Sequence, residues 1–293
     1  MTVELKPING TDFYLWKYLP SLPAAIASAL LFTFVTVPLC WRIKKGHGRS
    51  LFFCIPFAIG GAFQVIGFGT RIISYFYTNE IAPNVIQSIF ILLAPVFYAA
   101  SIYTVLGRLI RSIHGDRFSI VRPTRMTKIF VLGDFVALNV QGNAAGLTAK
   151  DNLRKIGEGI VIAGLFIQIF LFGFFIIAAA VFHRRYRRHL SKTSEPSLDV
   201  PWRQGLRMIY ACSALIMFRS VFRVVEYIMG VDGYLLSNEW PMYAFDTIPM
   251  WIVQVIFLLW FPDKFHVPPV DDGEVVLLGR IRERYKGLLS RSA

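Results

Sequence analysis

The sequence is poor in the residues that form disulfides, metal centres and nucleophilic active sites. It contains three cysteines and five histidines in 293 residues. Cys40, Cys54 and Cys212 lie in or beside long apolar stretches, which excludes a disulfide framework in polar loops. Every histidine lies outside those stretches, so histidines cannot hold haem iron or a catalytic metal between membrane helices. The sequence predicts no metal and no cofactor.

Motifs of enzyme chemistry are missing as well. There is no GxxxxGK[ST] loop, the turn whose backbone N–H groups cradle nucleotide phosphates. Neither a serine–histidine–acid set nor a cysteine–histidine set falls in one plausible location, and nucleophilic catalysis needs such a set. The last apolar stretch has no lysine in its depth, which excludes a retinal Schiff base. We therefore predict that the protein is not an enzyme.

Long apolar runs dominate what is present. Hydrophobic residues make up 55% of the chain, aromatic residues make up 15%, and the mean hydropathy is +0.53. A helix needs about 20 mostly apolar residues to cross about 30 Å of hydrocarbon. We predict an all-α membrane protein, a single bundle of seven transmembrane helices. The predicted spans are 22–41, 51–74, 85–107, 128–146, 158–182, 206–229 and 243–261.

Positive charge is divided unevenly between the connections. One alternating set holds 23 of the 31 lysines and arginines, and the other set holds 5. Cytoplasmic loops retain basic residues, so we predict an N-terminus outside and a cytoplasmic C-terminus. The fourth span is the least apolar, but without it the later connections would change sides. The net charge of +13 thus indicates orientation beside anionic lipid, and we predict no nucleic-acid binding.

This topology divides the chain into three parts. We predict an outer N-terminal tail at 1–21, a transmembrane domain at 22–263 and a cytoplasmic tail at 264–293. Asn9 begins an Asn-Gly-Thr triplet on the outer tail, which is the acceptor pattern for N-glycosylation. The expected location is the plasma membrane, with another cellular membrane as the alternative.

The sixth predicted span carries charged residues at spacings of i, i+4 and i+7. Arg219, Arg223 and Glu226 therefore lie on one face of that helix. A charged side chain at the bilayer centre costs roughly 2.5–3.5 kcal/mol on insertion scales, so such residues are paired, hydrated or functional. The stripe either forms an ion-pair clasp or lines a cavity in which a charged ligand replaces one partner. In the clasp, Arg223 pairs with Glu226, and Arg219 pairs with Asp134 or another neighbour.

Polar residues of the other spans gather mostly in the outer half of the predicted bundle. By chain direction, Asp134 alone lies clearly in the inner half, while Gln64 and Arg219 lie near the middle. Scattered hydrogen bonds between helices would give a more even distribution. We predict a hydrated ligand site or translocation path, and its candidate residues are Gln64, Arg71, Gln87, Asp134, Asn139, Gln141, Glu158, Arg219, Arg223, Glu226 and Asp246.

Several segments carry a resemblance to a known family. They are GFGTR (67–71), APVFYAASIYTVLGRLI (94–110), GDFVALNVQGNAAG (133–146), GEGIVIAGLFIQ (157–168), FRSVFRVVEY (218–227) and EWPMYAFDTIPM (239–250). With these segments in this order, the chain resembles the fungal seven-span lipid-translocating exporter family from about residue 50 to 263. That family includes aminocholesterol-resistance proteins and sphingoid long-chain-base exporters. The resemblance implies a fungal source and either membrane lipid handling or resistance to toxic amphiphiles.

Two positions depart from the pattern of that family. It often has an acidic residue where this chain has Gln64, and an amide where this chain has Glu158. Both positions belong to the predicted site. A carboxylate moved between helices changes where a cationic head can pair, so the two departures affect the choice of substrate.

The expected function is translocation of an amphiphile toward the outer leaflet, with membrane lipids or amphiphilic small molecules as partners. Glu226, Asp246 and Glu158 are natural partners for an ammonium head such as that of a sphingoid base. Arg71 and Arg223 would hold a phosphate or keep the carboxylates ionised.

Two further possibilities stay open at this point. Asp134 would serve as a proton site if transport is coupled to protons, unless it pairs with Arg219. The second functional hypothesis is a receptor-like lipid sensor that signals through its cytoplasmic loops, because receptors share the topology of seven spans and an outer N-terminus.

Overall fold

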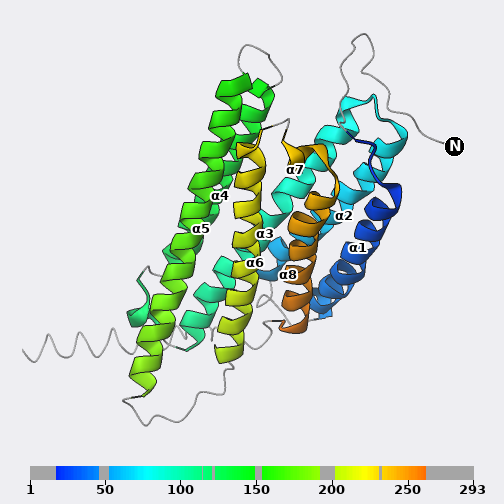
Figure 1. The fold of residues 1–293 in the computed structure, drawn as a ribbon. Helices are drawn as coiled ribbons and strands as arrows, with labels where there is room; N and C mark the ends of the chain where they lie inside the picture. The colour runs from blue at the N-terminus through cyan, green and yellow to red at the C-terminus, as the bar shows by residue number, and fades with distance from the viewer. Residues whose placement is uncertain are drawn as a thin grey trace, which may run out of the picture.

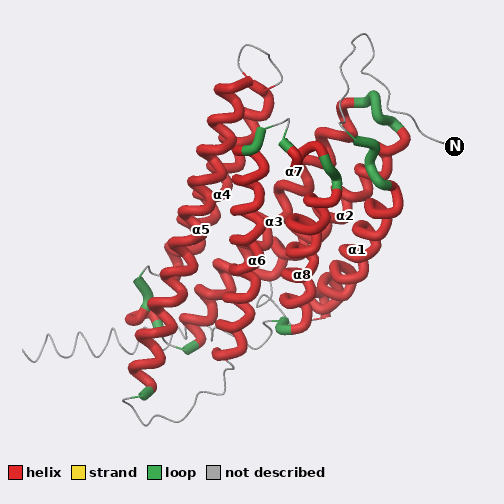
Figure 2. The backbone as a smooth tube through the Cα atoms, viewed as in Figure 1, coloured by secondary structure: helices red, strands yellow, loops and turns green. Residues whose placement is uncertain are grey.

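The apolar stretches of the sequence fold as long helices. The computed structural model describes residues 18–45, 53–113, 115–120, 123–148, 154–191, 202–230 and 233–261. Figure 2 shows no strand in this part of the chain. The elements are α1 (Leu22–Lys45), α2 (Ile55–Phe76), α3 (Ile81–Ser112), η2 (Asp116–Phe118), α4 (Pro123–Thr148), α5 (Arg154–Leu190), α6 (Trp202–Ile228), α7 (Tyr234–Ser237), the π-helical η4 (Met242–Thr247) and α8 (Ile248–Leu259).

Helices α3 and α6 lie at the centre of the bundle. Helix α3 packs against α2, α4 and α6, and α6 packs against α3, α5 and α8. Helix α1 covers one flank through its contacts with α2 and α8, while α4 and α5 run side by side along the other flank (Figure 1). This arrangement puts the charged face of α6 in the interior.

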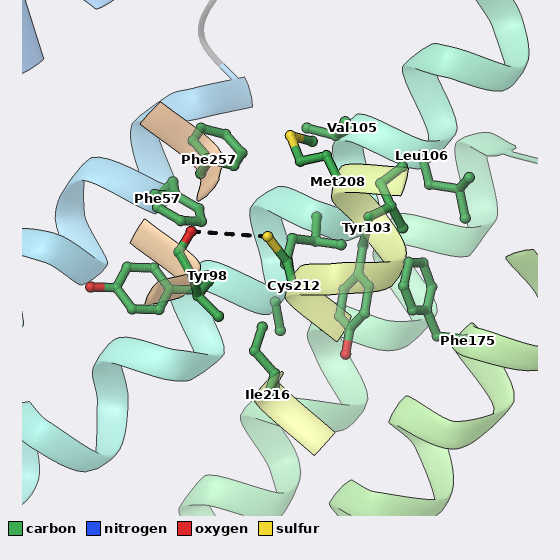
Figure 3. Packing of buried hydrophobic residues seen from close by; sticks show 14 of the residues in the cluster. Phe57, Tyr98, Tyr103, Val105, Leu106, Phe175, Met208, Cys212, Ile216 and Phe257 are labelled. Carbon is green, nitrogen blue, oxygen red and sulfur yellow. Dashed lines mark hydrogen bonds between the residues drawn. The ribbon is translucent and has the colours of Figure 1, made fainter. Parts of the chain in front are cut away.

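Large aromatic side chains fill the space between these helices (Figure 3). The Phe57 ring of α2 stacks on the Phe257 ring of α8 with centroids 3.8 Å apart, and it also meets Tyr98 of α3 at 4.5 Å. On the other side of α3, the Tyr103 ring lies 4.6 Å from the Phe175 ring of α5. All five side chains are fully buried. Offset and edge-on ring pairs add to the free energy gained by burying apolar area.

The outer surface of the bundle is apolar. Phe34 of α1 is 81% exposed and Phe170 of α5 is 75% exposed, as expected for side chains that face lipid tails. Within the described residues, six helices are long and apolar enough to cross a membrane: α1, α2, α3, α5, α6 and the continuous helix Met242–Leu259 formed by η4 and α8. Six spans of this length exceed what a soluble core uses, so the chain is a multi-pass membrane protein.

The number of transmembrane spans, six or seven, depends on whether helix α4 crosses the membrane. This helix has 26 residues, about 39 Å at 1.5 Å per residue, and it runs along α5 within the same bundle (Figure 1). It is less apolar than the six helices above because Asp134, Asn139 and Gln141 interrupt it. The seventh crossing, and with it the orientation, stays a prediction. Asn9 and the predicted cytoplasmic tail lie outside the described residues.

Glycines of α2 allow this helix to lie close to its neighbours. A Cβ atom on Gly60 would lie 2.8 Å from the backbone oxygen of Ala94 and equally close to the Tyr98 ring of α3. A Cβ atom on Gly67 would lie 2.7 Å from a side-chain carbon of Ile91. Small residues at a helix interface permit such approach in membrane proteins. The α2–α3 contact therefore depends on the absence of side chains at these positions.

The change Gly60→Ala tests that dependence. The added methyl group would meet a backbone atom that cannot rotate away, so we expect a loss of about 1–3 kcal/mol, the range seen for overpacked cores. Gly69→Ala is the matched control, because nothing lies within 4 Å of a Cβ atom there and alanine favours the helix by about 0.5–1 kcal/mol. Thermal unfolding of the purified variants measures both effects. Equal unfolding midpoints for the two variants would contradict the close α2–α3 contact.

Candidate ligand cavity and its ion-pair network

A cavity of about 210 Å³ lies between α2, α3, α6 and α7, at the α7 end of the bundle in Figure 1. Arg71 of α2, Gln87 of α3, and Arg223 and Glu226 of α6 contribute charged and amide groups to its wall. Apolar side chains complete the wall, among them Ile91, Leu92, Leu235, Leu236 and Met242. The cavity therefore offers both ionic groups and an apolar surface to one ligand.

The charged face of α6 is held by a carboxylate of the neighbouring segment η4. Asp246 accepts hydrogen bonds from Nε of Arg219 through one oxygen and from Nη2 of Arg223 through the other. Arg223 also donates from Nη1 to Glu226 at 2.9 Å. Asp246 is 1% exposed and Glu226 is 3% exposed. The predicted Arg223–Glu226 pair is confirmed, and Asp246 is the neighbour that pairs with Arg219.

The π-helical segment η4 places Asp246 in this position. A π-helical turn contains one more residue than an α-helical turn and is frequent at functional sites. Here the Thr247 hydroxyl donates to the carbonyl oxygen of Met242 at 3.3 Å. Pro249 follows in the first turn of α8 and has no N–H to donate to the preceding turn. The wider turn buries both Asp246 and Thr247.

A second ion pair borders the cavity at α2. Arg71 donates from Nη2 to Glu239 at 2.7 Å and lies over the Tyr243 ring with 5.7 Å between the guanidinium carbon and the ring centroid. Glu239 also accepts from the backbone N–H of Ser21 at 2.8 Å and from the Tyr243 hydroxyl at 3.2 Å. This pair connects α2, η4 and the residue immediately before α1 at one end of the bundle.

These ion pairs leave the region electrically neutral. Three arginines and three carboxylates take part: Arg71, Arg219, Arg223, Glu226, Glu239 and Asp246. Removing a charge from water costs several kcal/mol even after relaxation of the protein. Because every charge has a partner of opposite sign, the cavity can be hydrated or dry without leaving an isolated ion.

The predicted site residues divide into two groups. Arg71, Gln87, Arg223 and Glu226 line the cavity, and Arg219 and Asp246 extend its network. The other group lies elsewhere in the described residues: Gln64, buried on α2; Asn139, exposed and donating to Phe135 of its own helix; Gln141, 3.5 Å from Gln168 of α5; Glu158, half-buried on α5; and Asp134. A part in ligand handling stays a prediction for both groups.

Asp134 forms a separate buried site. It is 1% exposed and accepts a hydrogen bond of 2.8 Å from the Tyr103 hydroxyl of α3. The possibility that it pairs with Arg219 is therefore wrong, because Asp134 of α4 bonds to α3 while Arg219 of α6 bonds to η4. Within the described residues, the second carboxylate oxygen has no hydrogen-bond partner. Among the residues that the structure describes, Asp134 is thus a buried carboxyl group without a basic partner.

Glu239 is the functional candidate that the sequence reasoning missed. It belongs to the EWPMYAFD segment that carried the family resemblance, but it precedes the predicted seventh span and was counted with a loop. Its three partners are Ser21, immediately before α1, Arg71 of α2 and Tyr243 of η4. The available signal was an acidic residue four positions before Tyr243, in a connection (230–242) that holds Asp232 as well and lacks lysine and arginine.

Comparison with known proteins identifies the family. The model of the family described as RTA1 like protein matches residues 57–268, a range that includes every residue of the cavity network. The chain belongs to the RTA1-like family. This is the lipid-translocating exporter family expected from the motifs above. No solved structure shows a significant match to the chain.

Three curated relatives from Saccharomyces cerevisiae cover most of this RTA1-like chain. It is 32% identical to Protein RTM1, over 86% of this chain and 92% of the relative. It is 30% identical to Protoporphyrin uptake protein 1, over 85% of this chain and 92% of that one. It is 26% identical to Sphingoid long-chain base transporter RSB1 of strain YJM789, over 87% of this chain and 79% of the relative. The names Protoporphyrin uptake protein 1 and Sphingoid long-chain base transporter RSB1 are those of transport proteins, and neither denotes an enzyme.

The change Asp246→Asn tests the shared carboxylate of this RTA1-like protein. It leaves Arg219 and Arg223 with Glu226 as their remaining acid in the network, and breaking a buried pair costs about 3–5 kcal/mol. We expect the double variant Arg219→Gln with Asp246→Asn to lose less unfolding free energy than the two single variants lose together. Thermal unfolding of the four proteins in detergent gives the coupling. Additive losses would show that Arg219 and Asp246 do not stabilise the bundle as a pair.

Proposed function

We propose that this protein translocates amphiphilic lipids between the leaflets of a membrane. Sphingoid bases, sterol-like molecules and toxic amphiphiles are the substrate classes considered. The head of the substrate occupies the cavity beside α6, and its apolar part lies between helices. We further propose that movement is toward the outer leaflet and that the plasma membrane is the site of action. The names of the relatives, a sphingoid long-chain base transporter and a protoporphyrin uptake protein, support an amphiphilic substrate.

The sharing of Arg223 between two acids carries this proposal. Arg223 donates to Glu226 through Nη1 and to Asp246 through Nη2. An ammonium head that binds Glu226 therefore leaves Arg223 paired with Asp246. The exchange creates no isolated charge, whereas breaking a simple pair in a membrane would. Glu226 is thus the acid that a cationic substrate can engage at low cost.

The apolar part of the cavity suits a hydrocarbon chain. Leu92 of α3, Leu235 and Leu236 of α7 and Met242 of η4 lie in the same wall as Glu226. A cavity of about 210 Å³ holds a head group and the first carbons of a chain, so the remainder would extend between helices into the lipid.

Translocation of a fluorescent sphingoid base in liposomes tests the proposal. Purified wild-type protein is expected to speed movement of the probe between leaflets, and Glu226→Gln is expected to abolish most of that increase because an amide cannot pair with an ammonium group. Glu80→Gln is the matched control, because this substitution makes the same chemical change at an exposed residue, the N-cap of α3. The assay is run with the probe added to either leaflet, which measures direction.

Three results would contradict the proposal in different ways. Equal rates in wild-type and protein-free liposomes, across sphingoid, sterol-like and zwitterionic probes, would exclude autonomous translocation and favour the lipid-sensor hypothesis. Equal losses in Glu226→Gln and Glu80→Gln would remove the cavity from the path. Faster inward than outward movement would overturn the proposed direction. Circular dichroism of each variant establishes that the helices are intact.

We propose that Asp134 is the proton site of this transport. Its carboxyl group is buried, receives one hydrogen bond from Tyr103 and faces no arginine in the described network. Asp134→Asn keeps an acceptor for the Tyr103 hydroxyl but cannot bind a proton, so we expect translocation that no longer responds to a pH gradient. Tyr103→Phe keeps the carboxyl group and is expected to keep the response. An unchanged response in liposomes containing Asp134→Asn would exclude this role.

A further inference from the structure

A second cavity lies between the last turns of α5 and the first turns of α6. Its volume is about 270 Å³. In Figure 1 this is the lower end of the bundle, away from α7. Along α6, Tyr210 in this cavity and Arg223 in the first one are 13 positions apart, which is roughly 20 Å along a helix. The second cavity is therefore independent of the translocation site proposed above.

Aromatic rings form part of the wall of this second cavity. The Tyr210 hydroxyl donates to the carbonyl oxygen of Ala179 at 3.2 Å and lies 3.4 Å from Nδ1 of His183. The His183 ring lies 5.9 Å from the Tyr210 ring and 6.1 Å from the Trp202 ring, between centroids. These contacts tie α5 to α6 and give the cavity a defined shape.

Arginines surround these rings. Arg187 of α5 and Arg203 and Arg207 of α6 line the cavity, and all three are exposed. The guanidinium carbon of Arg203 lies 5.2 Å from the centre of the Trp202 ring. None of the described residues that line this cavity is acidic. A concave site lined by one sign of charge concentrates ions of the opposite sign, and the planar guanidinium group matches the oxygens of a phosphate.

The depth of the cavity indicates where such a phosphate comes from. The predicted spans end at residue 182 on α5 and begin at residue 206 on α6, so the lining residues lie at the boundary between hydrocarbon and head groups. Trp and Tyr favour this boundary. Basic pockets between membrane helices bind anionic lipid head groups at this level.

We propose that this cavity binds the phosphate head group of an anionic lipid in the leaflet that surrounds the α5–α6 end of the bundle. Arg187 and Arg207 approach the phosphate from the two helices, and the Trp202 and Tyr210 rings pack beside its glycerol region. The lipid would thereby hold the ends of α5 and α6 together. This site is a lasting contact with the membrane and is no step in translocation.

Binding of fluorescent phosphatidic acid to the full-length protein in detergent micelles tests this site. The double variant Arg187→Gln with Arg207→Gln is expected to bind roughly ten-fold to thirty-fold more weakly than the wild type, because two basic partners are lost. The control Arg185→Gln with Arg188→Gln removes the same charge from exposed positions of α5 that do not line the cavity. We expect that control, and also Glu226→Gln, to change the affinity by less than about three-fold.

Each other outcome would overturn part of the proposal. Equal weakening in both double variants would mean that general surface charge attracts the lipid. Equal affinity for a phosphatidylcholine probe would exclude recognition of an anionic head group. Displacement of the lipid by an equal concentration of inorganic phosphate would assign the site to a soluble anion. If the glutamine variant does not fold, Arg187→Lys with Arg207→Lys replaces it and is expected to bind at an intermediate strength, because lysine lacks the guanidinium fork.

Discussion

The carboxylate of Asp246 is the constraint on which the polar interior of this protein depends. Arg219 of α6 is buried, and Arg223, one turn further along the same face, is largely shielded from solvent at the cavity wall, so both charges need a partner of opposite sign inside the bundle. Asp246 pairs with both from the neighbouring segment η4. The pairing joins α6 to the last transmembrane helix and orients Arg223 so that its other nitrogen reaches Glu226. The cavity wall is a consequence of this arrangement.

The remaining charges follow the same rule at the same end of the bundle. Arg71 and Glu239 form a neutral pair beside the cavity, and Tyr243 contacts both. The interior is thus polar but carries no net charge from these six groups, while the apolar core toward the other end is filled by rings such as Phe57 and Tyr103. Under the proposed function, a ligand that brings its own charge would be admitted by exchange of partners, and a ligand without charge would meet the leucines of α7.

The sequence predicted the helices better than it predicted the contacts between them. Apolar length alone located six spans because bilayer thickness sets a simple requirement. The i, i+3 spacing predicted the Arg223–Glu226 pair because both residues belong to one helix. The partners of Arg219 and Asp134 come from other helices, and their identity depends on how those helices rotate against each other. Glu239 was missed for the same reason. It lies in a connection, and no periodicity in the sequence indicates that this connection approaches α1 and α2.

The π-helical turn of η4 has a consequence for how related sequences are aligned. A π turn is equivalent to a one-residue insertion into an α-helix, and one residue corresponds to about 100° of rotation. A helical-wheel projection drawn through residues 242–259 as one ideal helix would assign Asp246 and the residues of α8 to faces that differ by this angle. An alignment that permits a single-residue gap within Met242–Thr247 keeps the faces of both parts in register.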